Sequence, residues 1–299
     1  MKKLNHYVWQ HYLKPWTDKN GKIVCKNKGK LLVAGTKGFA SENYFYKLQM
    51  LTIDDIQFIK KIFFNDMNKI ILEVDKQWLA RFLWANEIIS IKDKIEDSNI
   101  LEEIDKLIKE FNEDIHTDIE NNSIKYLNFL YKKDISFYNT DQGNIDFNIF
   151  LSEQYFRTKP MKEIMMKTHI EIKNVNYENC WNLVSHILAI NLAATLSMQR
   201  NHFKCVLLNN NTDIPFLTSD QPVVNIAADK NNLRKLTINE FEFYYPITPN
   251  LALLICLKEN FLGTGNILDL EEINVKNYNA KMISQCGGIL FSNSKKGLV

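Results

Sequence analysis

The chain of 299 residues carries 37 basic and 35 acidic side chains, and 45% of its residues are apolar. This composition is typical of a globular protein and excludes disorder over long spans. A net charge of +2 gives no field strong enough to indicate nucleic-acid or membrane binding by itself.

The cysteines and the apolar segments predict a cytoplasmic protein. Five cysteines are scattered without a C-x-x-C pair, which predicts buried free thiols instead of a disulfide frame or a zinc site. The first six residues lack the apolar stretch of a secretory signal. Residues 179–199 contain no charged side chain and are long enough to span a bilayer, but Asn, Ser, His, Thr and Gln interrupt them. We therefore expect a buried core helix there and no membrane association.

In the first fifty residues, two short alternating segments predict strands, at residues 22–26 and 31–34. A long helical region follows. Thr52 and Asp55 form the start of a capping box, and apolar residues recur at helical spacing through 53–63, 70–89 and 95–131. Because charged residues fill the other positions, we expect amphipathic helices with solvated outer faces.

The second half of the chain changes from a helical to a strand-like period. Helices are expected at residues 147–157, ended by Pro160, and at 177–202. Apolar runs divided by Asn, Asp and Pro then predict strands at 205–208, 215–217, 223–226, 241–245 and 251–257, a helix at 270–285 and a strand at 288–292. The sequence therefore predicts a single α+β domain over residues 1–299. Its helical N-terminal and middle region would pack on a mostly C-terminal mixed or antiparallel sheet, with a helical insertion at about 50–140.

The segment Pro-Phe-Leu-Thr-Ser-Asp-Gln-Pro-Val-Val places polar residues between two apolar runs. Phe216 predicts a buried strand that ends near Asp220, since Pro222 disfavours both a helix and a central ladder position. Ser219 and Asp220 would then lie rigidly at the rim of a sheet. A carboxylate there can serve in catalysis, and it can equally close an Asx turn by accepting backbone N–H groups.

Two further clusters combine polar with apolar residues. Near the N-terminus, His6 and Gln10 share one face if the segment is helical, which allows the imidazole to act as acid or base. Gln154 and Arg157 are three positions apart on a predicted helix and point the same way, toward the core. An inward arginine needs an anion, either a carboxylate such as Asp220 or a substrate phosphate. The alternatives are a hydrogen-bonded core histidine and an internal ion pair.

The remaining histidines and the motif search give weaker indications. His116, His169, His186 and His202 are isolated in the sequence, and we expect structural roles for them. No P-loop, G-x-G-x-x-G, G-x-S-x-G or H-E-x-x-H pattern is present. The sequence therefore indicates no nucleotide cofactor.

Taken in order along the chain, these motifs resemble the bacterial family catalogued as domain of unknown function 4238. The resemblance covers nearly the full length, with Trp9 where the family commonly has Pro and Gln221 where Asn is usual. It implies which polar residues converge and supplies no activity. The segments that carry it are the opening His-Tyr-Val-x-Gln-x-Tyr-Leu, Gln-Tyr-Phe-Arg-Thr from Gln154, Ser-Asp-x-Pro-Val-Val from Ser219, Tyr-Pro-Ile-Thr-Pro from Tyr245, and Asn279 in a late helix.

Convergence of these polar residues predicts one shared site. The expected catalytic residues are His6, Arg157 and Asp220, and the expected substrate contacts are Gln10, Gln154, Ser219 and Asn279. We expect the three catalytic side chains to lie within about 10 Å of one another around one cleft.

The leading hypothesis is an intracellular hydrolase that acts on a phosphodiester or nucleotide, of the nuclease-toxin or phage-defence kind. Arg157 would hold a phosphate, and His6 would serve as acid and base. Asp220 would orient His6 or coordinate a divalent metal through water. The alternative is a non-catalytic anion-binding or sensor module whose polar cluster is structural. Either hypothesis allows a partner protein encoded nearby.

Overall fold

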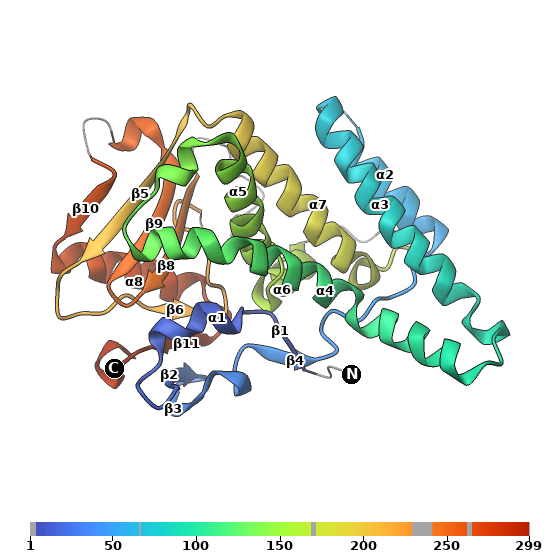
Figure 1. Ribbon diagram of the computed structural model, residues 1–299, viewed down its shortest axis with the longest axis horizontal. Helices are drawn as coiled ribbons and strands as arrows, with labels where there is room; N and C mark the ends of the chain where they lie inside the picture. The colour runs from blue at the N-terminus through green and yellow to red at the C-terminus, as the bar shows by residue number, and fades with distance from the viewer. Residues whose placement is uncertain (1–3, 66, 169–171, 229–240, 262–264, 299) are drawn as a thin grey trace.

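Figure 1 shows the computed structural model, which describes residues 4–65, 67–168, 172–228, 241–261 and 265–298. His169, for which a structural role was expected, lies outside the described residues. The sheets occupy the left and lower parts of the view, and long helices cross the middle and the right. Most helices come from the first two thirds of the chain and most sheet strands from the last third. The single α+β domain predicted from the sequence is therefore confirmed.

Three sheets contain the described strands. The largest has the order β10-β5-β9-β8-β7, in which β10 and β5 are parallel and the other neighbours antiparallel. A four-stranded antiparallel sheet has the order β3-β2-β11-β6, and β1 pairs with β4. The bounds are β1 Leu4–His6, β2 Lys22–Asn27, β3 Lys30–Gly35, β4 Ser41–Asn43, β5 Phe203–Asn210, β6 Thr218–Ser219, β7 Val224–Asn225, β8 Glu242–Thr248, β9 Leu251–Leu257, β10 Ile267–Leu270 and β11 Ile289–Ser292.

The helices form a second layer beside the large sheet. Helix α5 packs along α7 and against α4, and α3 and α2 cover another side of α7. The bounds are α1 Gln10–Leu13, α2 Ile53–Phe63, α3 Lys69–Ser90, α4 Ser98–Tyr131, α5 Asp141–Phe156, α6 Lys159–Thr168, α7 Tyr177–Met198 and α8 Glu272–Gln285. Short 3-10 turns join them, among them η2 Thr36–Gly38, η4 Ser136–Asn139 and η7 Lys258–Phe261.

Side chains at the N-termini fix where the long helices begin. The Thr52 and Asp55 capping box starts α2 as expected. Asp97 accepts hydrogen bonds from the first backbone N–H groups of α4, and Thr140 and Asn176 do the same for α5 and α7. These caps satisfy backbone donors that have no partner within a helix, and so hold each helix in register with its neighbours.

Helix α7 is the core helix that its sequence predicts. By length and composition it is the helix in the described part of the chain that could cross a membrane, but 61% of its most apolar window is buried. Its buried apolar residues, such as Leu183 and Ile187, pack with α2 and α3 in a second hydrophobic cluster. The five cysteines are free, and all but Cys286 are buried.

One local expectation differs from the structure, and helix α6 and three short strands were not expected. The strand expected at residues 215–217 is displaced to β6, because the side chain of Asn279 bonds the backbone of Leu217 and Pro215 in place of a neighbouring strand. Pro160 starts α6 as well as following α5, since a proline in the first turn lacks only an N–H that has no helical partner. The short strands β1, β4 and β10 carry too few residues to show a period.

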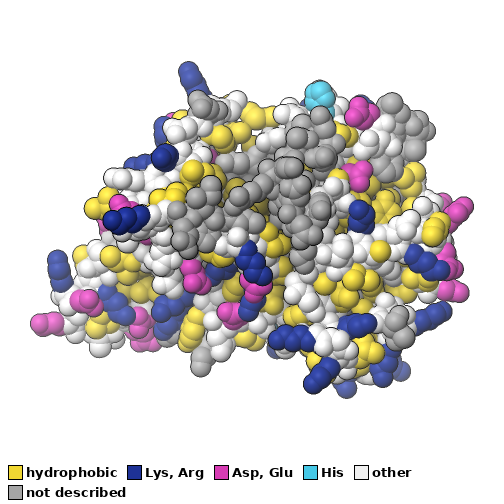
Figure 2. Space-filling model, turned by 180° about the vertical axis from the view of Figure 1, so that it is seen from behind, with side chains coloured by type: hydrophobic (Ala, Val, Ile, Leu, Met, Phe, Trp, Pro, Cys, Tyr) yellow, Lys and Arg dark blue, Asp and Glu magenta, His cyan; other side chains and the backbone are white. Residues whose placement is uncertain are grey.

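The surface seen from behind carries basic and acidic side chains interspersed (Figure 2). Basic side chains gather at the lower right of that view, over the end of the molecule that holds β2 and β3. Lys22, Lys28 and Lys30 are exposed there. The mixture agrees with the near-neutral charge balance of the sequence.

Candidate functional site

Arg157 is buried and fully paired within the protein. It caps the C-terminus of α5, with an exposed fraction of only 2%. Its Nη1 donates to Glu120 Oε1 at 2.5 Å, its Nε to the Tyr46 hydroxyl at 2.9 Å and its Nη2 to the His6 carbonyl oxygen at 2.8 Å. The guanidinium thus forms the internal ion pair that the sequence left open as an alternative, and the carboxylate is that of Glu120 instead of Asp220.

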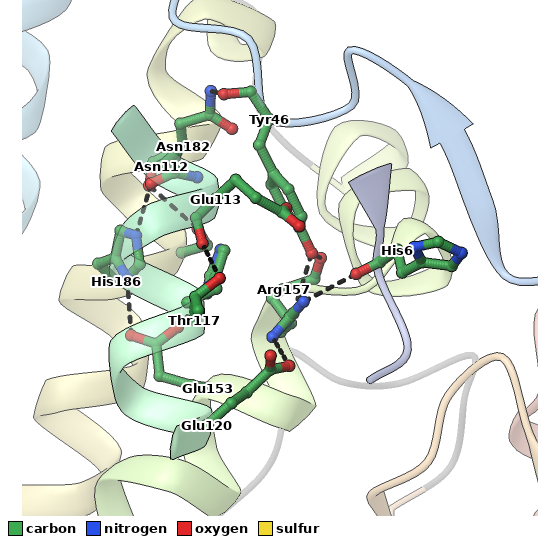
Figure 3. Close-up of polar contacts among 12 residues, drawn as sticks. His6, Tyr46, Asn112, Glu113, Thr117, Glu120, Glu153, Arg157, Asn182 and His186 are labelled. Carbon is green, nitrogen blue, oxygen red and sulfur yellow. Dashed lines mark hydrogen bonds and ion pairs between the residues drawn. The ribbon is translucent and has the colours of Figure 1, made fainter. Parts of the chain in front are cut away.

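The His6 side chain does not face Arg157. Figure 3 shows the His6 carbonyl directed at Arg157 and the imidazole directed away from it. The ring Nε2 lies 3.1 Å from the carbonyl oxygen of Lys37. Gln10 bonds Thr36 through both its amide atoms, which ties α1 to η2. These two residues therefore anchor the N-terminal segment to a neighbouring turn.

Asp220 closes the corner between β6 and the segment after α8. Its Oδ1 accepts the Gly287 N–H at 2.8 Å, and its Oδ2 accepts the Ile289 N–H at 3.3 Å. A Cβ on Gly287 would lie 2.8 Å from Asp220 Oδ2 and 2.3 Å from Pro160 Cγ, so only glycine fits this approach. The carboxylate therefore holds backbone, but that of a segment 67 to 69 positions later instead of the local Asx turn that was the alternative to catalysis.

Ser219 and Asn279 also bond local backbone. The Ser219 hydroxyl donates to the Gln221 carbonyl and accepts the Gln221 N–H, closing a tight turn. Asn279 accepts the Leu217 N–H at 2.8 Å and donates to the Pro215 carbonyl at 2.9 Å, which fastens this segment to α8. The structure therefore brings Gln154 together with Arg157 beside Glu120. The other predicted site residues direct their side chains to different partners: His6, Gln10, Ser219, Asp220 and Asn279.

The polar side chains that do converge lie between α4, α5 and α7, and we call them the buried polar core. His186 is at its centre, with Nδ1 2.7 Å from Glu153 Oε1 and Nε2 2.7 Å from Asn112 Oδ1 (Figure 3). Glu153 Oε2 lies 3.7 Å from Nδ1 of His116. The members are Asn112, His116 and Glu120 of α4, Glu153 and Gln154 of α5 with its cap Arg157, Asn182 and His186 of α7, and Tyr46.

Sequence reasoning missed most of this core, although a signal was present. Asn112, His116 and Glu120 follow one another at intervals of four residues, on the same face of α4 as the buried Ile104 and Ile108. Polar residues at the positions of an apolar stripe must find internal partners. His116 and His186 were treated as isolated, because their partners come from other helices, and Glu153 was not considered.

Burial dominates the electrostatics of the polar core. It lowers the pKa of His116 well below its usual value, and the positive charge of Arg157 acts in the same direction. Burial also raises the pKa of Glu120 to about 7, although Arg157 opposes this. Burial lowers the pKa of Arg157, but the charges of Glu120, Tyr46 and Glu113 and the hydrogen bond to Tyr46 together raise it. The polar core thus disfavours charge on His116, and Glu120 is the carboxylate that pairs with Arg157.

A second candidate lies at the opposite end of α5, where a cavity of about 480 Å³ opens to solvent. We call it the cationic pocket. It is formed where η4 and the start of α5 meet the turn before β5 and the residues after β9. Its lining consists of Arg200, Lys204 and Lys258, the amides Asn139, Asn144, Asn201 and Asn266, and Ile135, Tyr138, Phe203 and Cys205.

The lining of the cationic pocket has one sign of charge. Arg200 Nη1 lies 2.5 Å from Asp141 Oδ1, but both side chains are exposed, so this ion pair contributes little to the free energy of folding. Within the described lining there is no carboxylate and no imidazole. Tyr138 and Phe203 are buried, and the Tyr138 hydroxyl donates to Asn148 Oδ1, which fixes that ring. The pocket therefore presents cations and amide groups against rigid aromatic walls.

Comparison with known proteins gives one match. A family model described as "Protein of unknown function (DUF4238)" matches residues 5–296. No curated protein and no solved structure matches the chain.

Proposed function

Since the chain belongs to the DUF4238 family, whose description gives no activity, we propose from the geometry alone that it binds a phosphate-bearing anion in the cationic pocket. The ligand would be of the nucleotide or phosphodiester class. The observation that carries this proposal is a lining with three basic side chains, the exposed amides of Asn139, Asn201 and Asn266 and, among its described residues, no acid. Oriented cations and amides are the groups that recognise phosphate oxygens.

The N-terminus of α5 adds to this positive field. The 16-residue helix begins at Asp141, and Asn139 and Asn144 on either side of that residue both line the pocket. The N-terminal end of a helix carries about half an elementary positive charge, which favours an anion within the first turn. Thr140 already caps the Gly143 N–H. The helix therefore contributes its dipole, and the side chains contribute the direct contacts.

The size and the walls of the pocket fit a ligand larger than a free phosphate. A cavity of about 480 Å³ falls in the range of small-molecule sites. Tyr138 and Phe203 supply the apolar surface on which a base or another planar group can pack. We therefore infer a nucleotide or the end of a phosphodiester chain as the preferred ligand.

Hydrolysis at this pocket has less support than binding. General acid–base catalysis needs a titrating group within hydrogen-bond reach of the reacting atoms. The described lining offers no carboxylate or imidazole for this role, and burial raises the pKa of the Cys205 thiol, which disfavours the thiolate. The proposal is accordingly the binding or sensor module, with the hydrolase as the alternative that the same experiment addresses.

Titration calorimetry at low salt tests the proposal, with inorganic phosphate, AMP, ATP and a short single-stranded oligonucleotide as probes. We expect a nucleotide to bind more tightly than phosphate, and Lys258→Ala and Lys204→Ala each to weaken binding about tenfold. Lys19→Ala, a change at an exposed lysine outside the pocket, is the matched control and should leave affinity unchanged. Chromatography of each mixture detects turnover. Absence of binding by every probe would overturn the proposal, and release of a cleaved product would favour the hydrolase.

A further inference from the structure

We propose that His116, Glu153 and His186 form a buried site for one divalent transition-metal ion, with zinc as the best match. The three residues come from α4, α5 and α7, the helices that pack at the centre of the molecule. One ligand atom from each lies within 4.8 Å of the other two. This site is separate from the cationic pocket, and its test does not depend on the proposed anion ligand.

Unsatisfied polar atoms in the cluster support the assignment. Within the described residues, both ring nitrogens of His116 lack a hydrogen-bond partner, and so does Glu153 Oε2. All three side chains are buried. Buried polar atoms without partners are rare, because an unpaired polar atom loses its hydration without compensation. A cation between these atoms would bind an imidazole lone pair and the carboxylate together.

His186 is already oriented as a ligand. Its Nε2 lies 2.7 Å from Asn112 Oδ1, and a bond from that N–H to the amide oxygen fixes the tautomer with the Nδ1 lone pair free. Nδ1 faces Glu153 Oε1 at 2.7 Å, a distance that requires a proton between them in the absence of a metal. A metal ion replaces that proton and leaves the Asn112 bond intact.

The donor set determines the class of metal. Two imidazole nitrogens and one carboxylate oxygen suit zinc and similar ions, whereas calcium and magnesium prefer oxygen ligands alone. The ring of Trp78 stacks on His186 at 4.3 Å, and that of Tyr46 lies 4.5 Å from His116. Both rings thus pack directly on the proposed ligands. The ion would join three helices, and water would take its fourth position, as in metal sites with three protein ligands.

Burial is the largest cost of placing charge at this site, and the positive charge of Arg157 adds to it. The Glu120 carboxylate, 2.5 Å from Arg157 Nη1, compensates that charge. The remaining local charge is that of Glu153, which has no arginine or lysine among its contacts in the described residues. A divalent cation therefore meets a carboxylate whose partners are imidazoles.

Metal analysis of the intact protein is the first test. The chain should be expressed without a histidine tag in zinc-supplemented medium, stripped by refolding with a chelator, and titrated with zinc or cobalt. We expect about one zinc per chain as purified, a rise in melting temperature on adding zinc, and the visible absorption bands of four-coordinate cobalt. A wild-type protein that takes up no stoichiometric zinc or cobalt in either preparation overturns the proposal.

Matched variants assign the ligands. We expect His116→Gln and His186→Gln to lower zinc affinity at least a hundredfold and to abolish the cobalt spectrum. His202→Gln, at an exposed histidine outside the cluster, and Cys286→Ser should retain both. If the histidine variants do not fold, Glu153→Gln provides the third variant, and the wild-type stoichiometry and cobalt spectrum decide the result. Unchanged zinc affinity in folded His116→Gln contradicts the assignment.

Discussion

The two ends of α5 show two ways in which this protein uses polar side chains. At its C-terminal end, Arg157 is buried and each of its three donor nitrogens has a partner within the chain. At its N-terminal end, Arg200 and Lys258 border a cavity open to solvent. A polar group that is already satisfied internally stabilises a fold and cannot bind a ligand without losing those partners. The comparison therefore assigns a structural role to the Arg157 ion pair and favours the pocket as the site of the proposed anion.

The strongest way to test this comparison is to remove Arg157. We expect Arg157→Ala to lower the free energy of unfolding by about 3–5 kcal/mol, because Glu120 is left buried without its counter-charge. Chemical denaturation monitored by circular dichroism measures the loss. An arginine that waits for an anion without an internal partner would cost much less to remove.

A double variant separates the ion pair from the packing around it. Replacing both partners by apolar residues of similar size, as in Arg157→Met with Glu120→Leu, should recover much of the stability lost in Arg157→Ala. If Arg157→Ala unfolds at the same denaturant concentration as the wild type, the buried polar core is not structural and the comparison fails.

Asp75 of α3 sharpens the comparison, because it is a buried carboxylate with an amide as its partner. Its Oδ2 accepts from Asn191 Nδ2 at 3.2 Å, and burial raises its pKa from 3.8 to about 6. Between these two values the folded state binds more protons than the unfolded state, so stability falls as pH rises from about 4 to 6. We expect Asp75→Asn to stabilise the protein by about 2–3 kcal/mol at pH 8 and to have little effect at pH 3.5.

Denaturation of both proteins at several pH values checks this expectation. Asp146→Asn is the comparison variant, at a half-buried aspartate that has a lysine and a hydroxyl besides an amide as partners, and it should not stabilise at pH 8. A stabilisation by Asp75→Asn that is equal at both pH values would show that the carboxylate charge is not its cause.

A substitution at Asp220 tests whether the Ser-Asp-x-Pro segment has a structural role, in holding backbone, or a catalytic one. Asp220→Asn keeps one acceptor oxygen but directs an NH₂ group at one of the two backbone N–H groups of Gly287 and Ile289. We expect a loss of about 1–2 kcal/mol with ligand binding unchanged. Asp213→Asn, an exposed change in the same segment, should cost less than about 0.5 kcal/mol. A folded Asp220→Asn protein that no longer binds its ligand would restore Asp220 to the functional site.

The fold was largely predictable because its signals are local. The capping box at Thr52, the amphipathic stripe of α4 and the charge-free run of α7 each depend on residues a few positions apart. The prediction of a strand at residues 215–217 was wrong, because the Asn279 side chain of α8 bonds the Leu217 backbone in place of a neighbouring strand. No pattern within that segment reports a partner from a helix more than fifty residues later.

The candidate site was less predictable, because convergence is a property of the tertiary packing. Gln154 and Arg157 were correctly placed facing the core, yet the partner Glu120 lies on a helix whose acids were interpreted as solvated. Asp220 and Asn279 were selected for their polarity beside apolar runs, and the structure uses that polarity to hold backbone. Sequence identified some of the buried polar residues, such as Arg157 and Asp220, and only the structure shows the groups to which they bond.

The smallest expected effect on stability belongs to the cationic pocket. Lys258 is exposed, and Lys258→Glu should change the free energy of unfolding by less than about 0.5 kcal/mol. The same change replaces a cation by an anion in the pocket lining, so it should weaken a phosphate-bearing ligand more than Lys258→Ala does. The charged groups that would contact the ligand are exposed to solvent, so salt screens them. Raising the salt from 50 to 200 mM should therefore weaken ligand binding to the wild type more than to Lys258→Glu. Calorimetry at both salt concentrations measures ligand binding at the N-terminal end of α5, and a melting curve of the same variant measures stability. If Lys258→Glu changes neither the melting temperature nor the affinity for the ligand, the ligand does not contact this pocket.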